Sequence, residues 1–345
     1  MRKLTIIGLL LLAAAIVALL LYRSYDEVYR PLALPDDGLL LYVPSGSEAS
    51  DVAELLDSLG LLESKELCMW LMERKNYRGE MVEAGKYRIA PGTSLNGLIN
   101  SLRGGRDEEM IKITFHHART LPELAGAVAR YIEADSSSLA AHLKEPTTAA
   151  AFGFNAESFI TMFLPDTYFM EWDSDAAAFT RRMAKEYKAF WTDERLAKAK
   201  ALKLSQSEVS ILASIVEAEQ LLHVDERPTI AGLYLNRLRR GMKLQSDPTV
   251  IFALGDFSIR RVLTTHLTTE SPYNTYRNVG LPPGPIRLPQ KSSIDAVLNA
   301  EEHGYLYMCA REDFSGYHAF AKNLAEHNRN AQAYRMALNK KKIYR

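Results

Sequence analysis

The chain has 345 residues, of which 47% are hydrophobic and 24% are charged, a composition typical of a folded protein with more than one domain. Its 42 Lys and Arg residues balance 42 Asp and Glu residues, so the formal net charge is zero. No basic cluster stands out, and we expect no nucleic-acid partner. Two cysteines, Cys68 and Cys309, are too few for a zinc site or a disulfide framework. Whether they pair with each other is left open.

An apolar run without charges covers residues 4–22, with Arg2 and Lys3 before it and Arg23 after it. About 20 apolar residues are needed to cross a bilayer. A cleaved signal peptide is the alternative, but its apolar region is usually shorter and ends at small residues, whereas this run ends in bulky and charged ones. We therefore predict a membrane helix at 4–22, with residues 1–3 in the cytoplasm and the rest of the chain outside.

A stem is predicted at residues 23–37. Three similar stretches follow, each combining a β-type run, a Pro/Gly/Ser turn and a short amphipathic helix. The β-type runs are residues 39–43, 87–90 and 111–115. Each unit is too small to bury its own apolar face, so we expect them to pack as small α+β modules. The third unit and a mainly helical connecting region make up residues 108–200. The helical pattern of the connecting region is broken by FLPDTYFMEWDSD.

Several start and stop signals follow in the remaining part of the chain, residues 201–345. Ser205 and Glu208 form a capping-box pattern at the start of a helix expected to run to residue 222. Two further helices are predicted, one ending at Gly241 and one beginning at Asp247, with Pro at its first position. The stretch 271–290 contains five prolines and cannot be a regular element. A loop of this length in a compact domain is usually functional.

Glu217 and Glu219 lie in the apolar run near the end of the helix that the capping box begins. At 100° per residue, Glu219 falls within the apolar stripe, whereas Glu217 falls on the opposite side. We therefore predict an exposed Glu217 and a buried Glu219. A buried carboxyl group either finds a partner, for which Arg237 is the candidate, or has a raised pKa and keeps its proton. A protonated carboxyl group is what a general acid requires, but a structural ion pair remains equally open.

Other chemistry is less clearly indicated. No phosphate-binding glycine loop, H-E-x-x-H or G-x-S-x-G motif occurs, and we expect neither a cofactor nor a metal. Tyr273, Asn274 and Tyr276 combine rings and an amide, as sugar-binding clefts do, although a rigidly packed loop would use the same residues. His318 lies in a possible strand and is weak evidence for a site.

Six stretches together resemble the endolytic murein transglycosylase (YceG-like) family. They are AGKYRIAPGTS, FLPDTY, LASIVEAEQ, ERPTIAGLYLNRLRRGMKLQSDPTVIFALG, SPYNTYRNVGLPPGPIRLP and YHAFAKNLAEHN, in this order. The resemblance implies a single-pass inner-membrane protein with a periplasmic LysM-like domain, at residues 38–107, and a catalytic α+β domain, at residues 201–345, with its catalytic Glu on a helix.

The resemblance also implies a reaction. Family members cleave glycan strands of peptidoglycan internally, at the MurNAc–GlcNAc β-1,4 bond, leave 1,6-anhydro-MurNAc ends and terminate glycan elongation. The catalytic acid is the second Glu of E-x-E-[TS], which is Glu219 here. The C6 hydroxyl of the sugar acts as nucleophile, so one carboxyl group suffices, whereas conventional hydrolysis uses two. Peptidoglycan synthases are implied as partners.

Motif match and polarity give the candidate substrate-binding residues, which are Asn236, Gln245, Asp247, Tyr273, Asn274 and Tyr276. Two departures from the family pattern occur. Gln220 stands where Thr or Ser is usual, and FHHARTL replaces a V-x-E-G-x-[ST]-type turn. Two alternatives remain: a non-catalytic peptidoglycan-binding scaffold of the wall-synthesis complex, and a hydrolytic muramidase with Asp247 as its second carboxylate.

Overall fold

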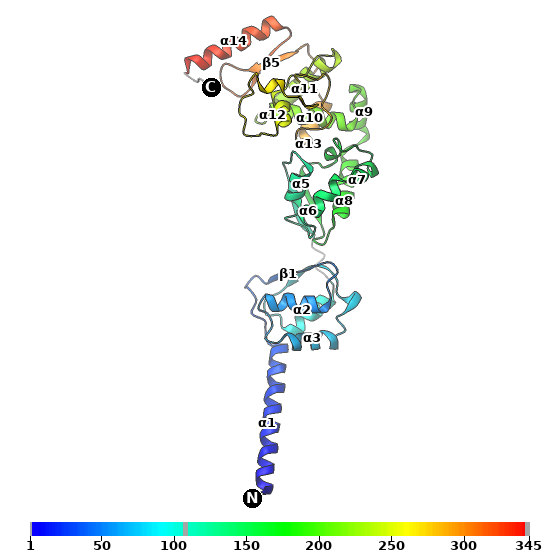
Figure 1. The fold of residues 1–345 in the computed structure, drawn as a ribbon, viewed down its shortest axis with the longest axis vertical. Coiled ribbons are helices and arrows are strands. Elements are labelled where there is room, and N and C mark those ends of the chain that lie inside the picture. Colours follow the sequence, from blue (N-terminus) through cyan, green and yellow to red (C-terminus); the bar gives the residue numbers. More distant parts are fainter. Residues whose placement is uncertain (1, 106–109, 342–345) are drawn as a thin grey trace. The chain divides into compact units, whose positions relative to one another are not determined.

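The computed structural model describes residues 2–105 and 110–341 and divides the chain into two compact units (Figure 1). Unit 1 comprises the chain up to Lys112 together with Tyr131–Glu133 and Phe169–Ser174. Unit 2 comprises Ile113–Arg130, Ala134–Tyr168 and the chain from Asp175 onward. Helices and short two-stranded sheets are mixed along the chain, so the predicted α+β class is confirmed.

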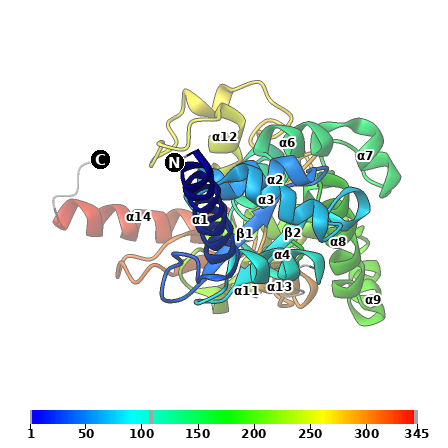
Figure 2. The ribbon, with the colours of Figure 1, turned by 90° about the horizontal axis from the view of Figure 1, so that it is seen from below.

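The first helix, α1 (Arg2–Tyr29), is longer than the predicted membrane segment. Its stretch Ile6–Tyr29 is long and apolar enough to cross a membrane. The last turns continue past the apolar run because they pack on unit 1, where Val28 is buried in the core and the Glu27 carboxylate accepts a hydrogen bond from the Ser64 amide at 2.7 Å. The predicted stem is therefore partly helix, and α1 runs directly into the globular part of unit 1 (Figure 1). Figure 2 shows the same helix foreshortened, from below.

Unit 1 is built around one antiparallel strand pair. Strand β1 (Leu39–Val43) pairs with β2 (Gly85–Ile89), with Leu41 opposite Tyr87. Its helices are α2 (Ala49–Ser58), α3 (Lys65–Arg74), the short η1 (Gly79–Met81) and α4 (Leu95–Arg103). The first two strand–turn–helix stretches predicted from the sequence therefore share one core, because β1 and β2 need each other as partners.

The third predicted strand, β3 (Ile111–Phe115), pairs with β4 (Asp166–Met170). Strand β4 was missed, because FLPDTY was interpreted as a break between helices. The alternation that defines it is short: Tyr168 and Met170 are buried, whereas Phe169 between them is exposed. Helices in this part of the chain are α5 (Leu121–Val128), α6 (Ser136–Lys144), α7 (Pro146–Ala151), η2 (Phe159–Met162), α8 (Ala176–Phe190) and α9 (Asp193–Leu202).

Helix α10 (Gln206–Glu219) begins with the predicted capping box, since the side chains of Ser205 and Glu208 bond reciprocally to backbone amides. It ends three residues before the expected position. Every residue from Val209 to Glu217 is buried, because α10 packs against α9, α11 (Arg227–Arg239), α12 (Asp247–Leu254) and α13 (Lys291–Leu298). A helix enclosed in this way has no solvent-exposed face.

The remaining elements of unit 2 follow α10 in the sequence. They are η3 (Val224–Glu226), η4 (His266–Thr268), the antiparallel strands β5 (Tyr307–Ala310) and β6 (His318–Ala321), and α14 (Leu324–Lys340). Residues 271–290 contain no helix or strand, as predicted. Close packing is visible at Gly232 on α11, where an added Cβ would lie 2.3 Å from the Glu301 carbonyl oxygen.

Candidate active site

Glu219, the last residue of α10, lies at a cavity of about 310 Å³ within unit 2. Helices α11 and α14, the start of α12 and strands β5 and β6 surround it. The lining residues are Glu219, Leu233, Tyr234, Arg237, Leu244, Gln245, Asp247, Tyr276, Tyr307, Met308, Cys309, Ala310, His318 and His327. The cavity therefore combines a carboxyl group with aromatic and polar side chains from separate parts of the chain.

One oxygen of the Glu219 carboxyl group is fixed by two hydroxyl groups. The Tyr234 hydroxyl donates to Oε1 at 2.8 Å, and the Ser246 hydroxyl donates to the same atom at 2.5 Å. Among the residues that the structure describes, none hydrogen-bonds to Oε2. The arrangement holds the carboxyl group in one orientation and leaves the second oxygen available to a bound molecule.

The surroundings favour the protonated form of this acid. Burial raises the pKa of Glu219 above its ordinary value, and the hydrogen bonds from Ser246 and Tyr234, together with the charge of His318, offset only part of that rise. The carboxylate of Asp247 raises the pKa of Glu219 further. A carboxyl group that keeps its proton to higher pH than an exposed Glu is suited to general acid catalysis.

Arg237 does not pair with Glu219, so the partner predicted from the sequence was wrong. Its guanidinium donates to the Lys243 and Leu306 carbonyl oxygens, both at 2.9 Å, and to Oε1 of Gln245 at 2.5 Å. Tyr234, one helical turn earlier on α11, reaches the acid instead. Arg237 still lines the cavity, where it fixes the position of Gln245.

Glu217 is buried with an exposed fraction of only 1%, so the prediction of an exposed carboxylate was wrong. Its Oε1 lies 3.2 Å from Nε of Arg287. Its Oε2 accepts hydrogen bonds from the Gln290 amide at 2.7 Å and from the Ser293 hydroxyl at 2.6 Å. Glu219 is only half-buried, because its carboxyl group faces the cavity. The burial of these two glutamates is therefore the reverse of the prediction, and their partners differ as well.

Three of the six predicted substrate-binding residues line the cavity with Glu219. They are Gln245, Asp247 and Tyr276. The Tyr276 hydroxyl donates to Oδ1 of Asp247 at 2.6 Å, which ties the proline-rich loop to the start of α12. Gln245 has a left-handed backbone with a φ of 53°, a conformation costing about 1–3 kcal/mol that persists where surrounding contacts enforce it. Strain of this kind is frequent at functional sites.

Asn236 and Asn274 do not line the cavity, because their amides bind backbone groups. Asn236 donates to the carbonyl oxygens of His303, at 2.7 Å, and Tyr305, at 3.1 Å. Asn274 is fully buried, and its Oδ1 accepts from the Tyr276 amide at 3.0 Å. Both amides therefore hold neighbouring segments in place, the second directly beside a residue of the cavity wall.

Tyr273 also lies outside the cavity lining. Its ring packs on Phe252, with 4.7 Å between the ring centroids. An added Cβ at Gly284 would lie 2.7 Å from the Tyr273 hydroxyl oxygen, so the side chain packs between α12 and the proline-rich loop. This placement is that of the rigidly packed loop, which was the alternative interpretation of these residues.

The sequence did not indicate the two hydroxyl groups that donate hydrogen bonds to Glu219. Tyr234 and Ser246 both occur within the quoted stretch ERPTIAGLYLNRLRRGMKLQSDPTVIFALG, so the signal was present in the motif. Nothing in helical periodicity pairs either residue with Glu219, because these contacts join separate elements. Tyr307 and His327 also line the cavity and were not considered.

The chain is similar to known proteins over most of its length. The model of the YceG-like family matches residues 41–333. A crystal structure of a YceG-like protein from Listeria monocytogenes superposes with a TM-score of 0.58 at 26% identity, covering 86% of this chain and 99% of that one. The chain therefore belongs to the YceG-like family.

Two curated relatives carry a more specific name. The endolytic murein transglycosylase of Bacillus subtilis is 31% identical over 314 residues, covering 87% of this chain and 85% of its own length. The endolytic murein transglycosylase of Streptococcus pneumoniae strain D39 is 26% identical over 358 residues, covering 90% of this chain. The alignment spans 61% of the length of the pneumococcal protein.

Proposed function

We propose that this protein is an endolytic lytic transglycosylase of peptidoglycan, which cleaves the MurNAc–GlcNAc β-1,4 bond within nascent glycan strands and leaves 1,6-anhydro-MurNAc ends. The observation that carries the proposal is the half-buried Glu219 carboxyl group, which has a raised pKa and presents to a polar cavity one oxygen that has no hydrogen-bond partner among the described residues. The names of the two curated relatives support the same reaction class.

Glu219 acts first as acid and then as base. Protonated Oε2 donates its proton to the glycosidic oxygen, the bond from C1 of MurNAc to that oxygen breaks, and positive charge develops on the MurNAc ring. The C6 oxygen then closes on C1, and its proton passes to the Glu219 carboxylate, which restores the acid without consuming water. Tyr234 and Ser246 stabilise the transient carboxylate by donating to Oε1.

Gln245, Asp247 and Tyr276 hold the glycan next to the acid. The Tyr276 ring offers a flat surface for a sugar ring, and Asp247, held by the Tyr276 hydroxyl, accepts hydrogen bonds from sugar hydroxyls. Asn236, Tyr273 and Asn274 act indirectly. Asn236 fixes the segment that leads into β5, Asn274 fixes the backbone of Tyr276, and Tyr273 packs the loop on Phe252 of α12. In this assignment, only the first three contact substrate.

A hydrolytic muramidase is the second candidate, because the cavity contains a second carboxylate. Asp247 lies near enough to Glu219 to raise its pKa, and conventional glycosidases use two carboxyl groups. The hydrogen bond from Tyr276 engages Asp247, which favours a binding role. The non-catalytic scaffold is disfavoured because the proposed acid, Glu219, and both hydroxyl groups that donate to it are present.

Product analysis distinguishes these functions. The full chain in detergent is incubated with uncrosslinked glycan strands, and fragments are identified by mass. We expect internal cleavage with 1,6-anhydro ends, which are lighter by one water than reducing ends. Reducing ends would establish the muramidase, and intact strands would establish the scaffold.

The proposed location follows from α1. Arg2 and Lys3 before the apolar stretch favour a cytoplasmic tail at residues 1–3, so α1 anchors the chain in the inner membrane and the chain after α1 lies in the periplasm. A LysM-like domain at residues 38–107 would hold peptidoglycan near the catalytic domain at residues 201–345. Peptidoglycan synthases are the proposed partners, with cleavage terminating glycan elongation.

Removing a hydroxyl group that donates to Glu219 should change the pH dependence of cleavage. Glu219 must be protonated to act, so the rate falls as pH rises through its pKa. The Ser246 hydroxyl lowers the pKa of Glu219, and Ser246→Ala should therefore move the alkaline limb of kcat/KM to higher pH. The measurement is kcat/KM for glycan strands across a pH series.

Ser210→Ala provides the matched control, because Ser210 is buried on the same helix as Glu219 but its hydroxyl has no hydrogen-bond partner among the described residues. Its pH profile should coincide with that of the wild type. An alkaline limb that stays in place in Ser246→Ala would contradict the assignment of that limb to Glu219.

A further inference from the structure

His318, the first residue of β6, forms part of the cavity wall and is held by Glu226. Its Nδ1 lies 2.7 Å from Oε2 of Glu226, and its backbone amide donates to Oε1 of the same carboxylate at 2.8 Å. Among the residues that the structure describes, none hydrogen-bonds to Nε2 of His318. The ring is thus fixed through one nitrogen, and the other is without a protein partner.

The carboxylate behind His318 is ionised. Burial alone would raise the pKa of Glu226, but the hydrogen bonds from His318 and from the Gln220 amide outweigh burial and lower it. A carboxylate only accepts hydrogen bonds, so Nδ1 of His318 must carry the shared hydrogen. This fixes the ring so that Nε2 is the nitrogen available to another molecule.

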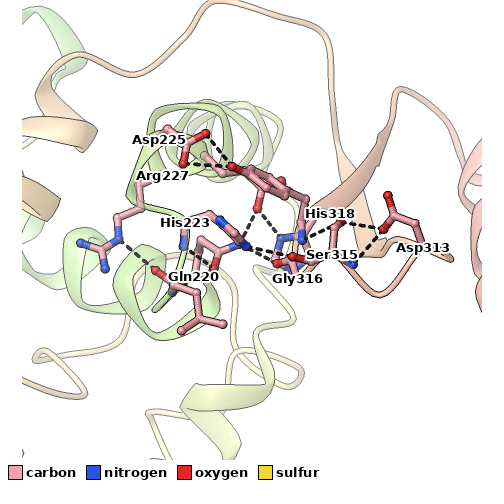
Figure 3. Close-up of polar contacts among 11 residues, drawn as sticks. Gln220, His223, Asp225, Arg227, Asp313, Ser315, Gly316 and His318 are labelled. Atoms are coloured by element: carbon pink, nitrogen blue, oxygen red, sulfur yellow. Dashed lines mark hydrogen bonds and ion pairs between the residues drawn. The ribbon is translucent and has the colours of Figure 1, made fainter.

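Gln220 connects this pair to the end of α10 (Figure 3). Its Nε2 donates to Oε2 of Glu226 at 2.7 Å and to the Gly316 carbonyl oxygen at 3.0 Å. Its Oε1 accepts from the amides of Leu222, at 3.1 Å, and His223, at 3.0 Å. The residue next to the proposed acid therefore also positions the turn that leads into His318.

The turn before β6 is held at a second point. The His223 ring stacks on Tyr317, with 3.8 Å between ring centroids, and its Nε2 lies 3.0 Å from the Ser315 carbonyl oxygen. An added Cβ at Gly316 would lie 3.0 Å from the same nitrogen of His223. The turn is thus packed closely against the segment that follows Glu219 (Figure 3).

We propose that His318 contacts the glycan directly, through a hydrogen bond between Nε2 and a sugar hydroxyl or N-acetyl group, and that Glu226 and Gln220 are positioning residues for its ring. This proposal rests on the proposed function. A polar ring atom that gives up water when the cavity fills costs free energy unless the ligand replaces that hydrogen bond. A site built in this way discriminates strongly against ligands that lack the matching group.

Two substitutions at His318 separate the two ring nitrogens. The amide of His318→Asn lies near the position of Nδ1 and can keep the contact with Glu226, whereas the longer His318→Gln places its amide near Nε2. The substitutions are made in the full-length Glu219→Gln chain, and Kd for uncrosslinked glycan strands is measured by calorimetry. We expect His318→Asn to weaken binding about tenfold, as the loss of one hydrogen bond does, and His318→Gln to weaken it less.

His116→Asn is the control, because His116 is exposed and does not line the cavity. Its Kd should equal that of the Glu219→Gln chain. Equal Kd values for His318→Asn, His318→Gln and the control would overturn the proposal. Since binding is measured without cleavage, a wild-type chain that binds glycan but does not cleave it would refute the proposed reaction and leave this proposal standing.

The positioning role of Glu226 is tested in the active enzyme. Glu226→Gln should raise KM more than it lowers kcat, because it misaligns a binding group and leaves Glu219 unchanged. In the His318→Asn background, the same substitution should have little further effect on KM. A purely structural role of Glu226 would instead lower Tm and add fully to the effect of His318→Asn, which would overturn the assignment.

Discussion

Replacing Glu219 with glutamine should reduce glycan cleavage by about 10²–10⁴-fold, the usual contribution of a general acid, without destabilising the fold. The amide oxygen still accepts hydrogen bonds from Tyr234 and Ser246 at the position of Oε1. The amide nitrogen takes the place of the unpartnered oxygen but cannot deliver a proton to a leaving group. Mass analysis of released fragments measures cleavage, and thermal unfolding gives Tm, which should be unchanged or raised.

The same variant should still bind glycan strands, which separates loss of chemistry from loss of binding. Residual cleavage close to that of the wild type would refute the assignment of Glu219 as the acid. A large fall in Tm would indicate instead that the carboxyl group is structural, which was the alternative that helical periodicity left open.

Replacing Glu217 with glutamine should have the opposite effect, a large loss of stability with little loss of activity per folded molecule. The substitution leaves the Arg287 guanidinium without its counter-charge. It also places the amide nitrogen either opposite Arg287 or opposite the two groups that now donate to Oε2. Breaking a buried ion pair by removing one partner costs on the order of 3–5 kcal/mol. Denaturant unfolding, with activity measured on the folded fraction, tests this expectation.

Glu194→Gln serves as the control for loss of an ion pair. Glu194 pairs with Lys198 at 2.7 Å on the surface, where its side chain is 76% exposed. Surface pairs contribute little to stability, so the unfolding midpoint should hardly move. A Glu217→Gln chain as stable as this control would show that the buried pair contributes nothing to the fold.

Glu217 and Glu219 illustrate what helical periodicity can and cannot predict. The capping box correctly predicted where α10 begins, because that signal depends only on neighbouring residues. The choice of an exposed face failed because α10 is enclosed on all sides, and the helices that enclose it lie far away in the sequence. The ion pair of Glu217 with Arg287 spans 70 positions, which no local pattern contains.

Strand pairing shows the same limit in unit 1 and in the region that follows it. Residues 111–115 were correctly predicted as a strand, but their partner β4 lies about 50 positions later and was interpreted as a break between helices. Similarly, β1 and β2 were assigned to separate units although they pair with each other. Alternation identifies a strand, whereas its partner is determined by tertiary packing.

For the candidate site, the sequence provided residue types but not their geometry. Polarity and motif match selected Gln245, Asp247 and Tyr276, which line the cavity, and equally Asn236 and Asn274, whose amides are used by the backbone. The sequence does not tell whether a side-chain amide faces a cavity or binds a backbone carbonyl oxygen. Only the fold distinguishes the two.

The contacts of the proposed acid, Glu219, join distant parts of the chain. Tyr234 and Ser246 follow Glu219 by 15 and 27 positions, and the strand carrying His318 comes still later, near the C-terminal end. Loops of such length close only as the surrounding elements assemble. While the chain is unfolded, Glu219 is a solvated carboxylate with an ordinary affinity for protons. Under the proposed function, the chain would therefore be unable to cleave glycan until its last elements dock, so that folding itself would control activity.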